Sequence, residues 1–296
     1  MGTNDSPELE IVIVSFRCEE LLRRCLASIA EHPPSVAHRV TVVDNASGDG
    51  TAPMVRREFP RTRLIELDSN RGFSHANNLV LSTTTARVVL LLNPDTEVRA
   101  GALDAALGRL AGDPRIGMVG VKLIQPSGEL DHACKRSFPT PLAALAHFTG
   151  LGRRRGAPRS LSHYRATHLS DDEPGEVDAV NGAFMAVRAE AVADVGGLDE
   201  GYWLYMEDLD WCYRFWERGW RVFYEPAGTV VHVKGGSSGE RRGLRQEVAF
   251  HRGMGRFYRK FEAKRRPGAV NVLVYLGIGA KLAVSLAITG FQRLCR

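Results

Sequence analysis

The first hundred residues alternate short apolar runs with longer segments in which apolar residues recur at helical spacing. Buried strands are predicted at residues 10–15, 40–43, 64–67 and 88–92, and helices at residues 19–30, 49–59 and 72–82. Strands that alternate with helices of this length indicate a mostly parallel sheet with helices on both faces. We therefore predict an α/β fold that binds ligands at the carboxyl ends of its strands.

The pattern changes after residue 100. A long, proline-punctuated and basic stretch runs from 125 to 178. Loops of this length are uncommon unless they are functional, so its arginines 153–155 belong either to a mobile loop or to an acceptor-binding face. The ordered elements predicted here are a helix to about residue 111, a strand at 116–121, a strand within 177–187, an acidic helix from about 207 and a strand pair at 221–224 and 229–233.

Polar side chains follow the predicted strands where each one ends. Asn93 and Asp95 come directly after the run 88–92, with Pro94 between them. Side chains two residues apart in an extended tip can converge on one hard cation, or on a diphosphate that the cation carries. The alternative is an ordinary turn stabilised by local hydrogen bonds. Asp44 leaves a similar choice, because a carboxylate there can bind a base or ribose, or can cap a helix.

Carboxylates also open the helix predicted from residue 207. Glu207 and Asp208 follow the aromatic residues Tyr202, Trp203 and Tyr205. The helix dipole favours acidic residues at a helix start, which explains part of the pattern without a function. The dipole does not explain why three aromatic residues precede them. In a partly apolar cleft the proton affinity of a carboxylate can be tuned, so we predict a general base here.

His232 ends the last predicted strand and precedes two glycines. An imidazole at that position can be a further metal ligand, because imidazole binds many divalent ions. The alternative is a surface histidine. The glycines at 235 and 236 permit close approach of phosphate oxygens to backbone amides.

Composition and charge narrow the class of protein. The chain has 296 residues, 44% of them hydrophobic, which is enough for a large core. The net charge is +5, and the excess lies late in the chain, which favours an anionic membrane surface as a partner. No nucleic-acid-binding motif accompanies these arginines, so we expect no nucleic-acid partner. Five cysteines without a Cys-x-x-Cys pair and a polar N-terminus without an apolar core predict an intracellular protein.

The C-terminal region combines a basic segment with an apolar one. A basic helix is predicted at 243–264, and residues 269–291 are apolar apart from four polar side chains. At about 1.5 Å per residue this stretch can cross a bilayer. Lys281 near its centre argues against a span, because a charge at mid-membrane costs at least ~2.5 kcal/mol. We therefore predict a helix or helix pair that lies in the membrane interface; the alternative is packing on the domain or on a second subunit of a homo-oligomer.

Taken in order, these motifs resemble family 2 glycosyltransferases of the GT-A fold, most closely the bacterial rhamnosyltransferase-like branch that acts on lipid-linked cell-envelope glycans. Each motif is weak alone, but the ordered combination over residues 9–238 is specific. The matching motifs are Ile-Val-Ile-Val-Ser-Phe at 11–16, Val-Val-Asp-Asn-Ala-Ser-Gly-Asp-Gly-Thr at 42–51, Asn-Arg-Gly-Phe at 70–73 with Asn77 and Asn78, Leu-Asn-Pro-Asp-Thr at 92–96, Asn-Gly-Ala at 181–183, Met-Glu-Asp-Leu-Asp at 206–210 with Arg214, and His232 with Gly-Gly-Ser.

The resemblance implies a role for each matched residue. Asp208 corresponds to the general base and Glu207 supports it. Asp95 and Asn93 correspond to the metal-diphosphate motif, and His232 to a further ligand of the same Mg²⁺ or Mn²⁺. The remaining residues implied in nucleotide-sugar binding are Ser15, Arg17, Asp44 (for the pyrimidine), Asn70, Gly72, Asn77 and Arg214 (for the base or the phosphates). Arg17 stands where relatives commonly have Asn, and Asn93 where many have Asp.

The resemblance also implies an organisation and a reaction. A flexible N-terminus at 1–8 precedes a transferase domain at 9–238, with a nucleotide half at 9–97 and an acceptor-binding and catalytic half at 98–238; residues 239–296 form a helical, membrane-associating extension. The implied reaction moves a sugar with inversion, L-rhamnose from dTDP-rhamnose, to a polyprenyl-linked or nascent cell-wall glycan at the cytoplasmic face of the cell membrane. A UDP-galactofuranose or UDP-hexose transferase is the alternative, and a non-catalytic glycan-binding module is the alternative from another class. A nucleotidyltransferase is disfavoured, because no glycine-rich loop follows the first strand.

Overall fold

A nine-stranded sheet forms the centre of the computed structural model, which describes residues 6–138, 169–233 and 243–294. Its strand order is β3 (Arg63–Glu66), β2 (His38–Asp44), β1 (Leu9–Ser15), β4 (Val88–Leu92), β10 (Phe184–Arg188), β6 (Ile116–Ile124), β11 (Arg221–His232) and β5 (Thr96–Val98), and β8 (Gly175–Glu176) pairs with β11. A second, two-stranded sheet joins β7 (Lys135–Arg136) to β9 (Ala179–Val180).

The strand directions confirm a mostly parallel sheet. β1 is parallel to β2 and β4, and β2 is parallel to β3. β10 is antiparallel to both β4 and β6, so β6 runs in the direction of β4, and β11 is parallel to β6. Six strands therefore share one direction and bring their carboxyl ends to one edge of the sheet.

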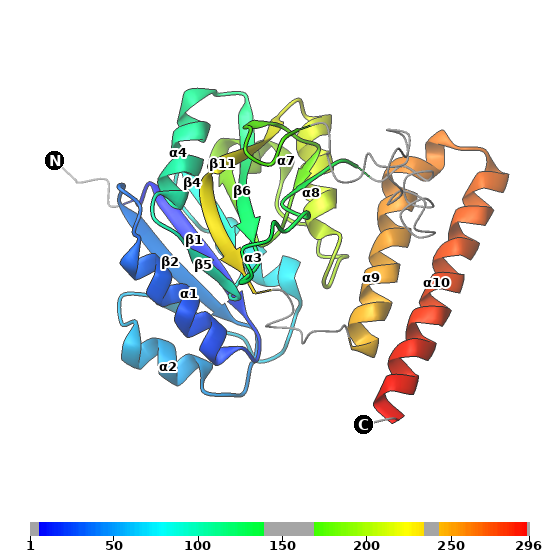
Figure 1. Ribbon diagram of the computed structural model, residues 1–296, viewed down its shortest axis with the longest axis horizontal. Helices are drawn as coiled ribbons and strands as arrows, with labels where there is room; N and C mark the ends of the chain where they lie inside the picture. The colour runs from blue at the N-terminus through cyan, green and yellow to red at the C-terminus, as the bar shows by residue number, and fades with distance from the viewer. Residues whose placement is uncertain (1–5, 139–168, 234–242, 295–296) are drawn as a thin grey trace.

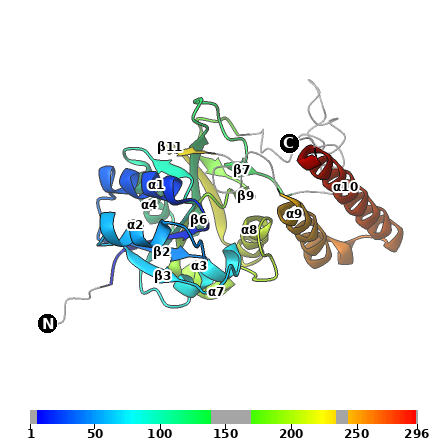
Figure 2. The same ribbon diagram turned by 90° about the horizontal axis from the view of Figure 1, so that it is seen from below.

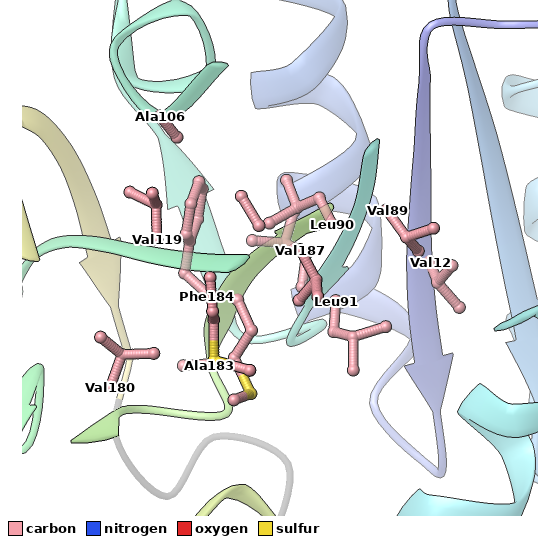
Figure 3. Packing of buried hydrophobic residues seen from close by; sticks show 14 of the residues in the cluster. Val12, Val89, Leu90, Leu91, Ala106, Val119, Val180, Ala183, Phe184 and Val187 are labelled. Atoms are coloured by element: carbon pink, nitrogen blue, oxygen red, sulfur yellow. The ribbon is translucent and has the colours of Figure 1, made fainter. Parts of the chain in front are cut away.

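Helices cover both faces of this sheet, as the alternating pattern predicts. α1 (Glu19–Glu31) and α4 (Ala102–Gly112) lie on one face, and α3 (Phe73–Leu81) and α7 (Ala189–Val195) on the other (Figure 2). α2 (Thr51–Glu58) packs beside α1, and α8 (Glu207–Glu217) packs on β9 and β11. Because both faces are covered, β1 and β4 are buried along their whole length. Figure 3 shows Leu90 and Leu91 of β4 beside Val12 of β1.

The sequence pattern missed several short elements, among them β5 and α7. β5 has only three residues, and α7 has seven that directly follow a strand. The predicted strand pair at 221–224 and 229–233 is wrong: β11 is one continuous strand, and its pairing with β6 shifts between Glu225 and Thr229. Pro226 lies in that shift, where its missing N–H removes no ladder hydrogen bond, so the Pro-Ala-Gly sequence forms a bulge instead of a turn.

The C-terminal region is a helical hairpin at the side of the sheet domain (Figure 1). α9 (Leu244–Phe257) continues through a π-helical turn (Tyr258–Glu262) and a 3₁₀ turn (Ala263–Arg265) into α10 (Gly268–Leu294). Figures 1 and 2 show α10 alongside α9, on the side away from the sheet. Both predicted C-terminal helices are thus confirmed, and the apolar one is continuous. The arginines 153–155 and the glycines 235 and 236 lie outside the described residues.

Charged contacts attach this hairpin to the sheet domain at Asp199 and Asp210. Lys260 Nζ donates to Asp199 Oδ2 at 2.9 Å and to Asp210 Oδ2 at 2.7 Å. Arg256 donates to both carboxylate oxygens of Asp199. Asp210 is fully buried in α8, so the hairpin is held against the helix that begins with Glu207 and Asp208.

Candidate active site

A cavity of about 750 Å³ opens at the carboxyl ends of the central strands, within the size range of small-molecule sites. Its lining includes seven of the predicted site residues: Asn70, Gly72, Asn93, Asp95, Glu207, Asp208 and His232. A second cavity, of about 480 Å³, is lined by residues of α3, α7 and their flanks and has no titratable side chain in its wall. The larger cavity is therefore the candidate site.

Asp95 and His232 meet where β4 and β11 end. The amide of Val233 donates to the Asp95 carbonyl oxygen at 2.8 Å, which fixes the end of β11 beside the turn after β4. The Nε2 atom of His232 then lies 3.5 Å from Asp95 Oδ1, and both side chains are buried. Asn93 lies in the same wall of the cavity, and the amide of Asn93 donates to the Ala183 carbonyl oxygen at 3.0 Å.

A second carboxylate, Asp131, contacts the other ring nitrogen of His232. Its Oδ2 atom is 3.1 Å from His232 Nδ1. Burial lowers the pKa of the imidazole, but hydrogen bonds with Asp131 and Asp95 outweigh that effect and raise it to about 9. The imidazole therefore holds a proton at neutral pH, and a cation that binds Nε2 must displace that proton.

The Asp95 side of the cavity fits a divalent cation. A carboxylate, an imidazole and an amide oxygen, from Asp95, His232 and Asn93, are suitable ligands for Mg²⁺ or Mn²⁺. Within the described ranges no group of three His, Cys, Asp or Glu side chains is arranged to hold a metal ion. This donor set matches sites in which one or two protein carboxylates bind the ion and substrate phosphates complete the shell.

Strained backbone presents the acidic residues at the opposite wall. Tyr205 and Met206 have φ values of 70° and 73°, in the left-handed region that non-glycine residues seldom adopt. Such strain costs about 1–3 kcal/mol per residue and is concentrated at functional sites. It turns the chain so that Glu207 and Asp208 form the first turn of α8 and line the cavity.

Asp208 is held by three donors. The amide of Leu209 donates to Oδ1 at 2.8 Å and the amide of Gly182 to Oδ2 at 3.3 Å. Arg136 Nη2 donates to Oδ2 at 2.6 Å and to the Val180 carbonyl oxygen at 2.5 Å. Arg136 lies in the basic stretch 125–178 and belongs to no recognisable motif, so no local pattern singled it out.

Glu207 lies in a different environment from Asp208. Its side chain is buried, and its Oε2 atom has no hydrogen-bond partner among the described residues. Burial first, and the charge of Asp208 second, raise its pKa from 4.5 to about 8. Glu207 is therefore a neutral acid at pH 7.

The loop from Asn70 to Gly72 forms a further part of the wall. Gly72 has a φ of 89°, and a Cβ there would come within 2.5 Å of the Trp203 carbonyl oxygen, so only glycine fits. Asn45, which the sequence analysis passed over, holds this loop: its Nδ2 donates to the Gly72 carbonyl oxygen at 3.1 Å and its Oδ1 accepts from the Arg71 amide at 2.9 Å.

Two of the predicted donor-binding residues are not in the cavity wall and bind elsewhere in the protein. The guanidinium of Arg214 donates to Asp210 Oδ1 and to the carbonyl oxygens of Val195 and Gly197. Asn77 is buried, and its Nδ2 donates to the Phe73 carbonyl oxygen within α3. Both side chains have structural roles.

Three other predicted residues lie beside the cavity and not in its wall. The Ser15 hydroxyl is buried 3.3 Å from Cys18 Sγ. Arg17 is exposed and donates to the Ser47 carbonyl oxygen at 3.3 Å. Asp44 Oδ1 accepts from the Ser47 amide at 3.1 Å, a hydrogen bond within the loop before α2, and it does not cap that helix, whose N-cap is Gly50. Donor contacts by these residues stay predictions.

The C-terminal hairpin also contributes to the cavity. Gln246 and Phe250 of α9 line it, and the guanidinium of Arg245 stacks 4.1 Å above the ring of Trp203. The functional unit thus extends past residue 238 into α9.

Comparison with known proteins shows the family of the chain. The family described as Glycosyltransferase like family 2 matches residues 7–247. Over 247 residues the chain is 31% identical to an N-acetylglucosaminyl-diphospho-decaprenol L-rhamnosyltransferase of Mycobacterium tuberculosis (strain ATCC 25618 / H37Rv), covering 78% of each chain. It is 28% identical over 169 residues to the rhamnosyltransferase WbbL of Escherichia coli (strain K12), covering 54% of this chain and 60% of the relative.

Solved structures are similar in fold at lower identity. A mannosyltransferase from Pyrobaculum calidifontis, in complex with GDP-Man and Mn²⁺, superposes with a TM-score of 0.59 at 20% identity, covering 96% of this chain and 75% of that one. S. aureus TarS 1-349, in complex with UDP-GlcNAc, gives 0.57 at 14% identity, with coverage of 92% and 71%. With its GT-A sheet and the matched residues 7–247, the chain belongs to the family 2 glycosyltransferases.

Proposed function

We propose that the protein is an inverting, metal-dependent rhamnosyltransferase. It would transfer L-rhamnose from dTDP-rhamnose to a hydroxyl group of a polyprenyl-diphosphate-linked or nascent cell-wall glycan. One observation carries the proposal: a single cavity is lined by Asp95 and His232 on one side and by Asp208 on the other. The choice of rhamnose is supported by two relatives that are named rhamnosyltransferases.

The residues of the cavity divide the reaction between them. Asp208 would accept the proton of the acceptor hydroxyl as that oxygen forms a bond to the anomeric carbon of the sugar. The bond from this carbon to the diphosphate breaks on the opposite side, and its electron pair leaves with dTDP. Asp95, His232 and Asn93 would hold the divalent cation, which when bound neutralises the charge that develops on the diphosphate.

The proposal includes attachment to the cytoplasmic face of the cell membrane through α10. Residues Gly268–Gly290 have a mean hydropathy of 1.9, and none of them is buried. Large apolar side chains on the outer side of the helix are exposed: Val272, Leu273, Leu276, Val284 and Ile288. Asn271 instead faces the hairpin, where its Oδ1 atom accepts from the Tyr258 hydroxyl at 2.7 Å, and Ser285 and Thr289 follow on the same side of the helix. A helix that turns its polar residues to protein and an apolar face outward suits a lipid environment.

The packing of α9 along α10 favours a helix in the plane of the membrane. A transmembrane α10 would take α9 into the hydrocarbon with Glu247, Arg252 and Arg256, at a cost of at least ~2.5 kcal/mol for each charge. In the interface, the apolar face of α10 enters the acyl region, and Lys264, Arg265 and Arg266 at the hairpin turn reach anionic headgroups. This arrangement would keep the cavity close to a lipid-linked acceptor.

The proposed reaction is tested with purified protein in phosphatidylcholine and phosphatidylglycerol vesicles. The acceptor is N-acetylglucosaminyl-diphospho-decaprenol, and dTDP-rhamnose, UDP-galactofuranose and UDP-hexoses are compared as donors, with Asp208→Asn as the inactive control. We expect transfer from dTDP-rhamnose alone, with inversion of the anomeric configuration detected by NMR. Transfer from a UDP-sugar instead would overturn the rhamnosyl assignment, and sugar binding without transfer from any donor would favour a glycan-binding module.

A further inference from the structure

One connector, between β6 and β7, contacts both ends of the active site. It leaves β6 after Ile124 and includes a tight turn in which the Gln125 amide donates to the Glu129 carbonyl oxygen at 2.7 Å. The Asp131 amide then donates to the Leu123 carbonyl oxygen at 2.8 Å, which attaches the connector to the sheet. Four residues later the chain enters β7 at Lys135 and Arg136.

Asp131 reaches the metal end of the cavity from behind. Its side chain is fully buried, with Oδ1 accepting from the Ala133 amide at 2.9 Å and Oδ2 lying 3.1 Å from His232 Nδ1. His232 and Asp95 line the cavity, whereas Asp131 is not among the lining residues. Asp131 therefore holds the ring nitrogen that faces away from the cavity and leaves Nε2 directed toward Asp95 and the cavity.

Arg136 reaches the opposite end. β7 pairs with β9, and Lys135 lies opposite Val180, so Arg136 is placed beside the segment that leads to Gly182. Its Nη2 atom donates to both the Val180 carbonyl oxygen and Asp208 Oδ2, and its side chain is only 10% exposed. A planar guanidinium can hold two acceptors in fixed directions, which a lysine ammonium does not do. Asp208 is thereby oriented by a residue from outside α8.

We propose that Asp131 and Arg136 are positioning residues of the active site, Asp131 for the metal ligand His232 and Arg136 for the base Asp208. The connector thus orients His232 and Asp208 through two different residues. The part concerning Arg136 rests on the proposed function, because it concerns the proton acceptor of a transfer reaction. The part concerning Asp131 needs only a cation at the Asp95 and His232 side and is independent of which sugar is transferred.

The two residues are tested as controls for each other. Mn²⁺ is titrated into the full chain, and free Mn²⁺ is measured by electron paramagnetic resonance for wild type, Asp131→Asn, Asp131→Ala and Arg136→Gln. We expect Asp131→Ala to weaken Mn²⁺ binding by about 10–100-fold, the usual effect of removing the partner of a ligating histidine. Asp131→Asn retains an acceptor oxygen and should weaken binding less. Arg136→Gln should bind Mn²⁺ as the wild type does.

Steady-state kinetics with the donor that the wild type uses give the second readout. Arg136→Gln should lower kcat by at least about 10-fold with an unchanged KM for the donor, because a misdirected base affects the transition state and not donor binding. Arg136→Lys should recover only part of this loss. Asp131→Asn should raise the KM for the donor, and thermal unfolding of each variant reports whether it folds.

Several results would overturn the proposal. Wild-type Mn²⁺ affinity in a folded Asp131→Ala would remove the role of Asp131, and if that variant does not fold, Asp131→Asn decides. Parallel loss of Mn²⁺ affinity and kcat in both Asp131→Asn and Arg136→Gln would mean that the connector is only structural. If the wild type does not bind Mn²⁺, the part of the proposal that concerns Asp131 is refuted. If another sugar nucleotide is the donor instead of dTDP-rhamnose, the proposed function fails, but the Mn²⁺ titration and the kinetics still test the roles of Asp131 and Arg136.

Discussion

Replacing Glu207 with glutamine should stabilise the protein at neutral pH while reducing its activity. The native carboxyl is buried, its Oε2 atom has no partner in the part of the chain that the structure describes, and its pKa rises from 4.5 to about 8 on folding. Between these two values the folded state binds more protons than the unfolded state, so stability falls as pH rises through this window. Glutamine has nearly the same shape and cannot ionise in either state, so the variant should not show this loss.

The expected size follows from the pKa values. At 1.36 kcal/mol per pKa unit, the native carboxyl costs almost nothing near pH 4, about 3 kcal/mol at pH 7 and about 5 kcal/mol above pH 9. The free energy of unfolding of Glu207→Gln should therefore equal that of the wild type near pH 4 and exceed it by these amounts at higher pH. A residue that lowers stability in this way is typical of a functional site, so we expect transfer activity to fall.

Urea unfolding of both proteins in detergent at pH 4, 5.5, 7 and 9 measures this difference. Glu217→Gln, at the partly exposed end of α8, is the matched control and should change the free energy of unfolding by less than about 1 kcal/mol at each pH. A stability difference between Glu207→Gln and the wild type that stays constant from pH 4 to pH 9 would refute the reasoning, because the effect depends on ionisation of Glu207 alone.

Two further predictions concern α8 and α10. Arg214→Ala leaves the buried Asp210 carboxylate with one cation fewer and should lower the free energy of unfolding by about 3 kcal/mol without changing nucleotide affinity. The control Arg218→Ala breaks an exposed ion pair on the same helix and should lower it by less than about 1 kcal/mol. Equal losses for the two variants in urea unfolding would contradict the argument from burial. A fluorophore on a cysteine at Val284 should be quenched by lipid-bound quenchers in anionic vesicles more than one at Ser285, and most by quenchers attached near the headgroups. Equal quenching at the two sites, or strongest quenching by quenchers attached deep in the acyl chains, would contradict an α10 that lies in the plane of the membrane.

Local patterns were sufficient to predict the sheet and most of the chemistry at its edge. Each long strand of the first half is an apolar run that ends in polar residues, and parallel strands bring such ends together at one edge. Asp95 and His232, which lie at strand ends, could therefore be expected at one edge before their distance was known, whereas Asp208 opens a helix and was grouped with them by the family resemblance. The family resemblance assigned Arg214 to the base or the phosphates and did not predict its pairing with Asp210, although four residues on a helix place these opposite charges side by side.

The residues that the sequence did not indicate are joined to the site only through tertiary structure. Asp131 and Arg136 lie 101 and 72 positions from the residues they contact, and nothing in their own neighbourhood distinguishes them from a polar loop. The bulge in β11 was misread for a related reason. Its Pro-Ala-Gly sequence fits a turn as well as a bulge, and only pairing with β6 on both sides of it selects the bulge.

Calorimetric titration of the wild type, Asp95→Asn and Asp208→Asn with dTDP, with and without Mn²⁺, tests the central claim that one cavity separates donor binding from proton acceptance. The account predicts that the wild type binds dTDP more tightly with Mn²⁺, that Asp95→Asn loses this dependence, and that Asp208→Asn keeps it. Transfer by Asp208→Asn should nevertheless fall by about 100-fold or more. Retained metal dependence in Asp95→Asn, or full transfer by Asp208→Asn, would contradict the assignment of the two walls of the cavity.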